Sequence, residues 1–153
     1  RGLGDVYKRQ VLRYTLQSNE SQSVSLREEM EFASAYIFLL KMRFENNLQF
    51  DIQIAKSFED YRLPPMAVQV LIENAVKHNE ISDRKPLTIH IVTNNEGYLS
   101  VSNDIQPKRT AASGTGIGLV NLAKRYRLLF KQDIQITEDK EFSVCIPLID
   151  EVQ

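Results

Sequence analysis

The spacing of apolar residues changes abruptly at Asn46-Asn47. Before this pair, apolar residues recur at alternating steps of three and four, the period of one helix face; they are Met30, Ala33, Ile37, Leu40 and Phe44. After it, apolar and polar residues alternate, the period of a half-buried strand; the apolar positions are Leu48, Phe50, Ile52 and Ile54. A helix that gives way so quickly to a strand excludes both an all-helical and an all-β fold.

The start of this helix carries its own local signal. Ser25 and Glu28 have the Ser-x-x-Glu spacing of a capping box, in which each side chain accepts a hydrogen bond from the other residue's backbone N–H. The helix is therefore predicted to begin at Ser25.

The same two periods predict the remaining elements. Leu63-Pro64-Pro65 ends an extended segment, because a residue before proline avoids the helical region, and Pro65 is expected in the first turn of a helix that runs to about His78. The further expected elements are a hairpin around Asn94–Gly97, a loop over 104–115, a helix over Ile117–Phe130 and strands over 134–137 and 142–148. This order predicts an α+β fold, a two-layer α/β sandwich whose mixed, mostly antiparallel sheet carries helices on one face.

The composition fits one globular domain and excludes several classes of protein. The chain has 153 residues, of which 42% are hydrophobic and 25% charged, with a formal net charge of -1. Such a balance provides no overall positive field, so no nucleic-acid partner is expected. The single cysteine, Cys145, cannot form an internal disulfide and is expected to be a buried packing thiol. No apolar run approaches the roughly 20 residues that span a bilayer.

The first ten residues, RGLGDVYKRQ, contain two glycines and show no periodicity. We predict that residues 1–10 are a non-native tail and leave them out of the fold.

Three segments carry chemically suggestive residues, and the first lies on the predicted helix that ends at His78. Asn74 and Lys77 are about one turn apart, so both side chains can point the same way. An amide oxygen can bind a hard cation while an ammonium group balances phosphate charge, which suits a Mg²⁺–polyphosphate ligand. The alternative is a polar helix face in water.

The second segment is rich in glycine and runs directly into a helix. Gly114, Gly116 and Gly118 allow close backbone approach, and the free N–H groups of a helix start favour an anion. A helix terminus supplies only about 0.3–2 kcal/mol, whereas micromolar binding needs about 8 kcal/mol. A pocket for the base and a metal ion must supply the rest of the binding free energy. The alternative interpretation of this glycine-rich segment is a flexible hinge.

The third segment, Val101-Ser102-Asn103-Asp104, ends a strand where the loop begins. A short polar side chain at this point can recognise a base edge, although capping of a turn is the commoner use of such residues.

In this order and at these separations, the three segments resemble the ATP-binding domain of sensor histidine kinases, which belongs to a wider group with gyrase and MutL. Residues 63–78 are similar to the N-box of the LytS-type subfamily, and residues 116–125 to its glycine box. The likeness extends upstream through 12–44. It implies a sandwich of the histidine-kinase ATPase type over 25–150, preceded at 11–24 by the remnant of a dimerisation and phosphoacceptor helical region.

The resemblance also implies roles for particular residues. Asn74 would hold Mg²⁺, Lys77 and His78 would lie near the phosphates of ATP, and residues 104–115 would form the ATP lid. Six residues just before and at the start of the following helix are expected to contact the nucleotide, and the glycines among them would lie along its phosphates; they are Gly114, Thr115, Gly116, Ile117, Gly118 and Leu119. Asn74 and Lys77 would be the catalytic residues.

The function implied is transfer of the ATP γ-phosphoryl group to a histidine on the missing upstream helix, for relay to a response regulator. The parent would be a homodimer, and this part of it a cytoplasmic domain of an inner-membrane-anchored bacterial protein. The water-activating glutamate of the gyrase group is replaced by Val70, which favours phosphoryl transfer over hydrolysis.

One departure from the family pattern leaves adenine recognition open. The family's adenine-binding aspartate corresponds either to Asn103 or, displaced by one residue, to Asp104. Two alternatives remain beside the kinase: a degenerate module that binds nucleotide or a partner without transferring phosphate, and an anti-sigma-factor type serine kinase.

Overall fold

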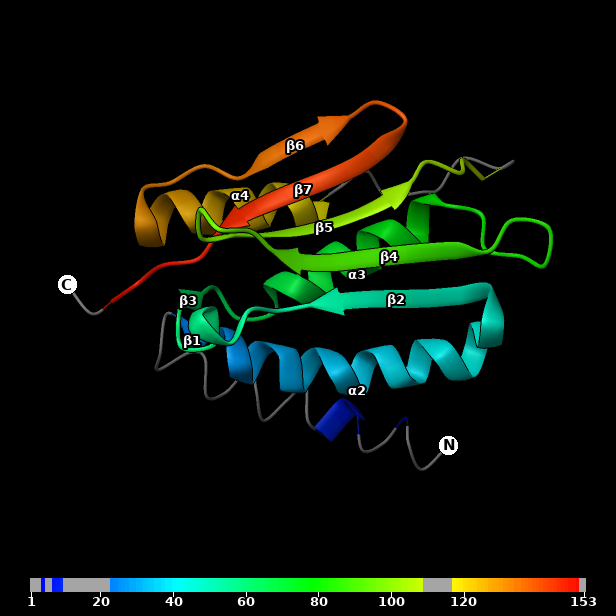
Figure 1. The fold of residues 1–153 in the computed structure, drawn as a ribbon, viewed down its shortest axis with the longest axis horizontal. Coiled ribbons are helices and arrows are strands. Elements are labelled where there is room, and N and C mark those ends of the chain that lie inside the picture. The colour runs from blue at the N-terminus through cyan, green and yellow to red at the C-terminus, as the bar shows by residue number, and fades with distance from the viewer. Residues whose placement is uncertain (1–3, 5–6, 10–22, 109–116, 152–153) are drawn as a thin grey trace.

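The computed structural model describes residues 4, 7–9, 23–108 and 117–151. Its main sheet has five strands in the order β2-β4-β5-β7-β6, with β2 parallel to β4 and the other neighbours antiparallel (Figure 1). The strands are β2 (Leu48–Gln53), β4 (Leu87–Thr93), β5 (Tyr98–Asp104), β6 (Gln135–Glu138) and β7 (Glu141–Pro147). A second, two-stranded ribbon pairs β1 (Val24–Ser25) with β3 (Arg62–Leu63). The predicted mixed, mostly antiparallel sheet is confirmed.

Within residues 23–108 and 117–151, three helices complete the sandwich: α2 (Leu26–Phe44), α3 (Ala67–His78) and α4 (Ile117–Phe130). Short 3₁₀ turns over Glu45–Asn47 and Lys56–Phe58 flank β2. Among the described helices, none combines the length and the apolar character needed to cross a bilayer.

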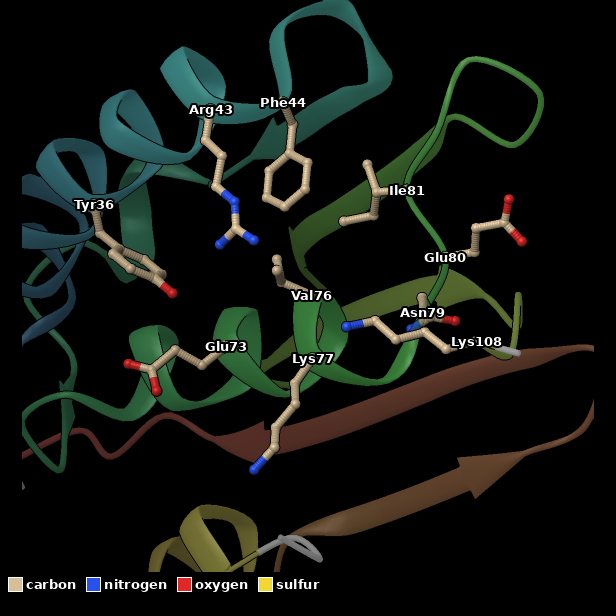
Figure 2. A pocket seen from close by; sticks show the side chains of 10 residues that line it. All are labelled: Tyr36, Arg43, Phe44, Glu73, Val76, Lys77, Asn79, Glu80, Ile81 and Lys108. Atoms are coloured by element: carbon tan, nitrogen blue, oxygen red, sulfur yellow. The ribbon is translucent and has the colours of Figure 1, made fainter. Parts of the chain in front are cut away.

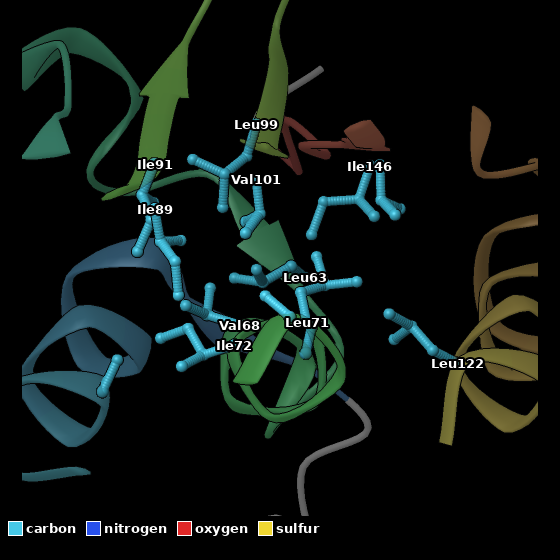
Figure 3. Close-up of a cluster of buried hydrophobic side chains, with 14 of the residues drawn as sticks. Leu63, Val68, Leu71, Ile72, Ile89, Ile91, Leu99, Val101, Leu122 and Ile146 are labelled. Carbon is cyan, nitrogen blue, oxygen red and sulfur yellow. The ribbon is translucent and has the colours of Figure 1, made fainter. Parts of the chain in front are cut away.

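The core lies between one face of the sheet and the helices. On β5, Leu99 and Val101 are buried, and the cross-strand partners Ile146 and Val144 on β7 are buried with them. Figure 3 shows these strands meeting Val68, Leu71 and Ile72 of α3, with Leu122 of α4 closing one side. The apolar face of α3 is thus fixed against the sheet, and its polar face is turned toward α4.

The beginning of α2 follows the prediction. Ser25 caps the helix, with its Oγ accepting from the Glu28 N–H and its own N–H donating to Glu28 Oε1, both at 3.1 Å. The helix ends at Phe44, two positions before the predicted Asn46-Asn47 stop.

The beginning of α3 differs from the prediction. Pro65 lies in a turn outside the helix, and the cap is Met66, whose φ of 70° and ψ of 6° are left-handed. The helix begins at Ala67, so the assignment of Pro65 to its first turn is wrong. The sequence around Pro65 could not reveal this, because the group that supports the turn lies far away on α2.

Burial along β2 and β7 departs from simple alternation. Leu48 is buried, but Ile52 is 43% exposed, and Ile54 lies beyond the end of the strand. β2 is an edge strand with a single neighbour, so its far end has little to pack against. Cys145 is only half-buried, because it alternates with the core residues Val144 and Ile146 and faces the other side of the sheet.

Candidate functional site

Two adjoining cavities lie where α3, the start of α4, the ends of β5 and β6 and the start of β7 come together. The larger has a volume of about 370 Å³, and its lining is Asn74, His78, Asn79, Ile105, Pro107, Leu119, Glu138 and Phe142. The smaller has about 130 Å³ and is lined by Val70, Glu73, Asn74, Lys77, His78, Ile117, Gly118 and Leu119. Asn74, His78 and Leu119 line both, so the two cavities adjoin one another, and the larger is of small-molecule size.

The α3 residues predicted from the sequence meet at this site. Leu71, Ile72 and Ala75 are buried in the core, which leaves Asn74 half-buried at the border between core and cavity. Among the described residues, no hydrogen bond partner is found for the Asn74 side chain. Lys77 lines the smaller cavity, and its ammonium group points toward α4 (Figure 2). An amide oxygen and an ammonium group therefore face one space.

The start of α4 supplies the opposite wall. Ile117, Gly118 and Leu119 line the smaller cavity. A Cβ added at Gly118 would lie 3.3 Å from Cγ1 of Val70, so α3 and α4 approach closely here because residue 118 lacks a side chain. The other predicted residues of this segment, Gly114, Thr115 and Gly116, lie outside the described residues, as does most of the predicted lid.

Asn103 and Asp104 at the end of β5 point to opposite faces of the sheet. Asn103 is 1% exposed and pairs with Phe142, a cavity residue, whereas Asp104 is exposed and pairs with Glu141. The Asn103 amide group donates from Nδ2 to the carbonyl oxygen of Asp104 at 2.8 Å. Its Oδ1 is therefore the atom left to accept a further bond. Neither side chain is among the lining residues of the two cavities.

Asn79 is a site residue for which the sequence analysis gave no role. It is 6% exposed, its Nδ2 donates to the carbonyl oxygen of Ala75, and its Oδ1 accepts from the Gln106 N–H, each at 2.8 Å. It also forms a β-bridge with Pro107. Asn79 thus ties the end of α3 to the segment that follows β5. Its place directly after a helix was the available signal, since asparagine often ends helices.

The charged groups around the smaller cavity are mixed. Glu73 accepts a hydrogen bond from Gln69 Nε2 at 2.8 Å and lies beside Lys77 on the rim. Within the described ranges, no group of three or more His, Cys, Asp or Glu side chains is placed to hold a metal ion. A cation at Asn74 would therefore need further oxygen ligands from a bound polyphosphate or from water.

Two larger hollows adjoin these cavities: the first shares Glu73, Lys77 and Asn79 with them, and the second shares Leu119. A groove of about 630 Å³ between α2 and α3 contains Tyr36, Arg43 and Lys108, and Figure 2 shows their side chains around it. Burial, and then the nearby Glu73 carboxylate, raise the pKa of Tyr36. A shallow, mainly apolar hollow of about 940 Å³ lies over α4 and β6. Neither hollow contains Asn74, so we place the candidate site by its chemistry and not by volume.

Comparisons of the sequence with known proteins identify relatives of this chain. A family described as Histidine kinase matches residues 9–48. The sensor protein LytS of Streptococcus mutans is 34% identical over 143 residues, which cover 83% of this chain and 24% of that protein. The sensor histidine kinase BtsS of Escherichia coli is 28% identical over 120 residues, covering 76% of this chain and 21% of that protein. The chain thus spans about a quarter of the length of these curated relatives.

Solved structures share the fold at low sequence identity. The catalytic domain of the histidine kinase ThkA is 18% identical with a TM-score of 0.56, over 84% of this chain and 99% of that one. The cytoplasmic segment of the histidine kinase QseC is 10% identical with a TM-score of 0.57, over 99% of this chain and 97% of that one. The chain is therefore a homologue of the LytS-type sensor histidine kinases, and its described residues have the fold of a histidine kinase catalytic domain.

Proposed function

We propose that this chain is the ATP-binding catalytic domain of a sensor histidine kinase and that Mg·ATP binds in the two adjoining cavities between α3 and α4. The observation that carries the proposal is the position of Asn74. This side chain lies at the junction of the cavities and makes no hydrogen bond within the described residues, so its amide oxygen is available to a ligand.

The residues present fit Mg·ATP. Asn74 would hold the metal through its amide oxygen, and Lys77 and His78, which line the smaller cavity beside it, would lie near the phosphates. Mg²⁺ would supply neutralisation of charge on the phosphate oxygens. The chain's own part is positional and electrostatic: it orients the phosphates beside an ammonium group in a partly enclosed space.

The described residues favour transfer over hydrolysis. The position one turn before Asn74 is Val70, which lines the smaller cavity and cannot remove a proton from water. Glu73 is exposed and hydrogen-bonded to Gln69. The proposed reaction is therefore transfer of the γ-phosphoryl group to a histidine.

That acceptor histidine is proposed to lie on a helix upstream of this chain. His78 lines the cavities themselves, and His90 lies on the sheet face away from them, 2.9 Å from Asp51 through Nδ1. The proposed partners are the dimerisation helix of the parent homodimer and a response regulator. The proposed location of the domain is the cytoplasmic side of an anchored parent protein.

Thermal melting tests the proposal. A ligand that binds only the folded state raises the melting temperature by mass action, so millimolar Mg·ATP should raise the midpoint by several degrees. Mg²⁺ alone and sodium chloride of equal ionic strength are the controls. An unchanged midpoint with Mg·ATP would favour the degenerate module that binds a partner and not the nucleotide.

Asn103 is expected to accept the adenine amino group. Asn103→Leu should lower ATP affinity at least about tenfold, because a buried amino group would lose its partner. Asp104→Ala should change it little, since Asp104 is exposed on the opposite sheet face. Titration calorimetry on the two variants decides between them. A larger loss with Asp104→Ala would make Asp104 the adenine acceptor.

Gly118 is expected to keep the phosphate end of the site open. Gly118→Val should weaken Mg·ATP at least about tenfold, because its branched side chain meets Val70 and narrows the smaller cavity. Gly118→Ala should have a smaller effect, since a single methyl group needs a shift of only a few tenths of an ångström. Equal affinities for Gly118→Val and the wild type would show that the phosphates lie elsewhere.

A further inference from the structure

Glu29 is a fully buried carboxylate at the start of α2. Its exposed fraction is 0%, although its neighbour in the sequence, Glu28, is exposed and completes the capping box of the same helix. Burial of a carboxylate is unfavourable unless hydrogen bonds replace its water. Glu29 obtains such bonds from α3: Oε1 accepts from the Met66 N–H at 3.0 Å, and Oε2 accepts from the Val68 N–H at 2.9 Å.

The start of α3 lacks the usual means of capping. Met66 holds a left-handed conformation, its side chain makes no capping hydrogen bond, and the first turn contains no acidic residue. A left-handed non-glycine residue is strained and persists only where its surroundings hold it. The two bonds from Glu29 hold the backbone on both sides of Ala67, and the carboxylate places negative charge at the positive end of the helix.

We infer that Glu29 is a positioning residue of the nucleotide site, which fixes the start of α3 and thereby the place of Asn74; the inference rests on the proposed function. Asn74 lies on the same uninterrupted helix as Val68, so a change in where α3 begins or how it is rotated moves the Asn74 amide. A displacement of about 1 Å near the reacting groups can change binding or rate by a large factor. Glu29 itself lines neither cavity.

The first test compares Glu29→Gln with the wild type by titration calorimetry with Mg·ATP, at a temperature where circular dichroism shows both proteins folded. Glutamine keeps the size of the side chain, but its NH₂ group cannot accept the second N–H. We expect Mg·ATP binding about tenfold weaker. Glu28→Ala is the matched control, because it removes a cap from the same turn of α2 without touching α3; its affinity should stay within about twofold of the wild type.

A double-mutant cycle separates positioning from a general loss of stability. If Glu29 acts through Asn74, the variant that combines Glu29→Gln with Asn74→Ala should bind no more weakly than Asn74→Ala alone. If the losses of Mg·ATP affinity in the two single variants add up in the double variant, the inference is wrong. It is also wrong if Glu29→Gln binds Mg·ATP as tightly as the wild type. If Glu29→Gln does not fold, Glu29→Asp takes its place in the cycle, since it keeps both oxygens and shortens their reach by one methylene.

Amide hydrogen exchange tests the physical tie without nucleotide. At least one of the Met66 and Val68 amides should exchange about tenfold faster in Glu29→Gln than in the wild type, because glutamine keeps only one acceptor oxygen; unchanged exchange at both amides would overturn the inference. The calorimetry also distinguishes the two proposals. A wild type that fails to bind Mg·ATP overturns the proposed function and the inference together, whereas a wild type that binds as well as its Glu29→Gln variant overturns the inference alone.

Discussion

Asn74→Ala should abolish the Mg²⁺-dependent part of nucleotide binding while the protein stays folded. Asn74 lies where the two cavities meet, and its amide oxygen is the chain's candidate ligand for the metal. Loss of a residue that only supports a metal ligand typically costs about 10–100-fold in affinity, so we expect loss of a direct ligand to cost at least about a hundredfold for Mg·ATP. The measurement is calorimetry with ATP, in the presence of Mg²⁺ and in the presence of EDTA.

The stability of the Asn74→Ala variant without nucleotide is the control. The side chain is half-buried and has no hydrogen bond among the described residues, so its removal should change the free energy of unfolding by less than about 0.5 kcal/mol. Asn74→Asp adds a second control, because it retains an oxygen ligand and should keep part of the Mg²⁺ dependence. Full Mg·ATP affinity in Asn74→Ala would remove Asn74 from the site.

Ile72→Ala should give one of the largest losses of stability in the chain. Ile72 is 0% exposed on the face of α3 that packs on the sheet (Figure 3). Removal of a buried isoleucine side chain costs about 2–5 kcal/mol, which corresponds to a fall in melting temperature of roughly 10 °C for a domain of this size. Urea denaturation measures the loss.

The matched control for Ile72 is Ile136→Ala on β6. Ile136 is 51% exposed, so the same chemical change there should cost less than about 1 kcal/mol. A similar loss at both positions would contradict the placement of α3 between the sheet and the site.

Local sequence signals were enough wherever neighbours in the chain decide the structure. The capping box of Ser25 and Glu28, the stop after Phe44 and the turn before Gly97 all depend on contacts between residues a few positions apart. Gly97 has a φ of 85°, which glycine adopts readily, and the Asn94 side chain accepts the N–H groups that close this turn.

The missed features depend on contacts between residues distant in the sequence. Pro65 is a good first residue for a helix, but Glu29 binds the backbone at Met66 and moves the start of α3 to Ala67. The role of Asn79 could not be predicted for the same reason, because its hydrogen-bond partner is the Gln106 N–H on another segment. The periodicity of apolar residues predicted that these helices and strands exist. The residues at which they begin and end, and the contacts between them, could be known only from the folded structure.

The positions of Asn103 and Asp104 could be assigned only from the observed strand register. Both are short polar residues at the end of one strand, and the alternation alone did not fix where that strand stops. The observed register extends β5 through Asp104, which places Asn103 on the same face as Leu99 and Val101. This register places the two candidates on opposite faces of the sheet, and which of them contacts adenine stays a prediction.

The most direct test of the account is to map bound Mg·ATP by amide chemical shifts in an ¹⁵N-labelled sample during a titration. If nucleotide binds between α3 and α4, the largest shifts should fall on Asn74, His78, Leu119 and Phe142, which line the two cavities and not the groove between α2 and α3. Shifts confined to the groove between α2 and α3, at Tyr36, Arg43 and Ile81, would contradict the account, because they would place the nucleotide on the other side of α3.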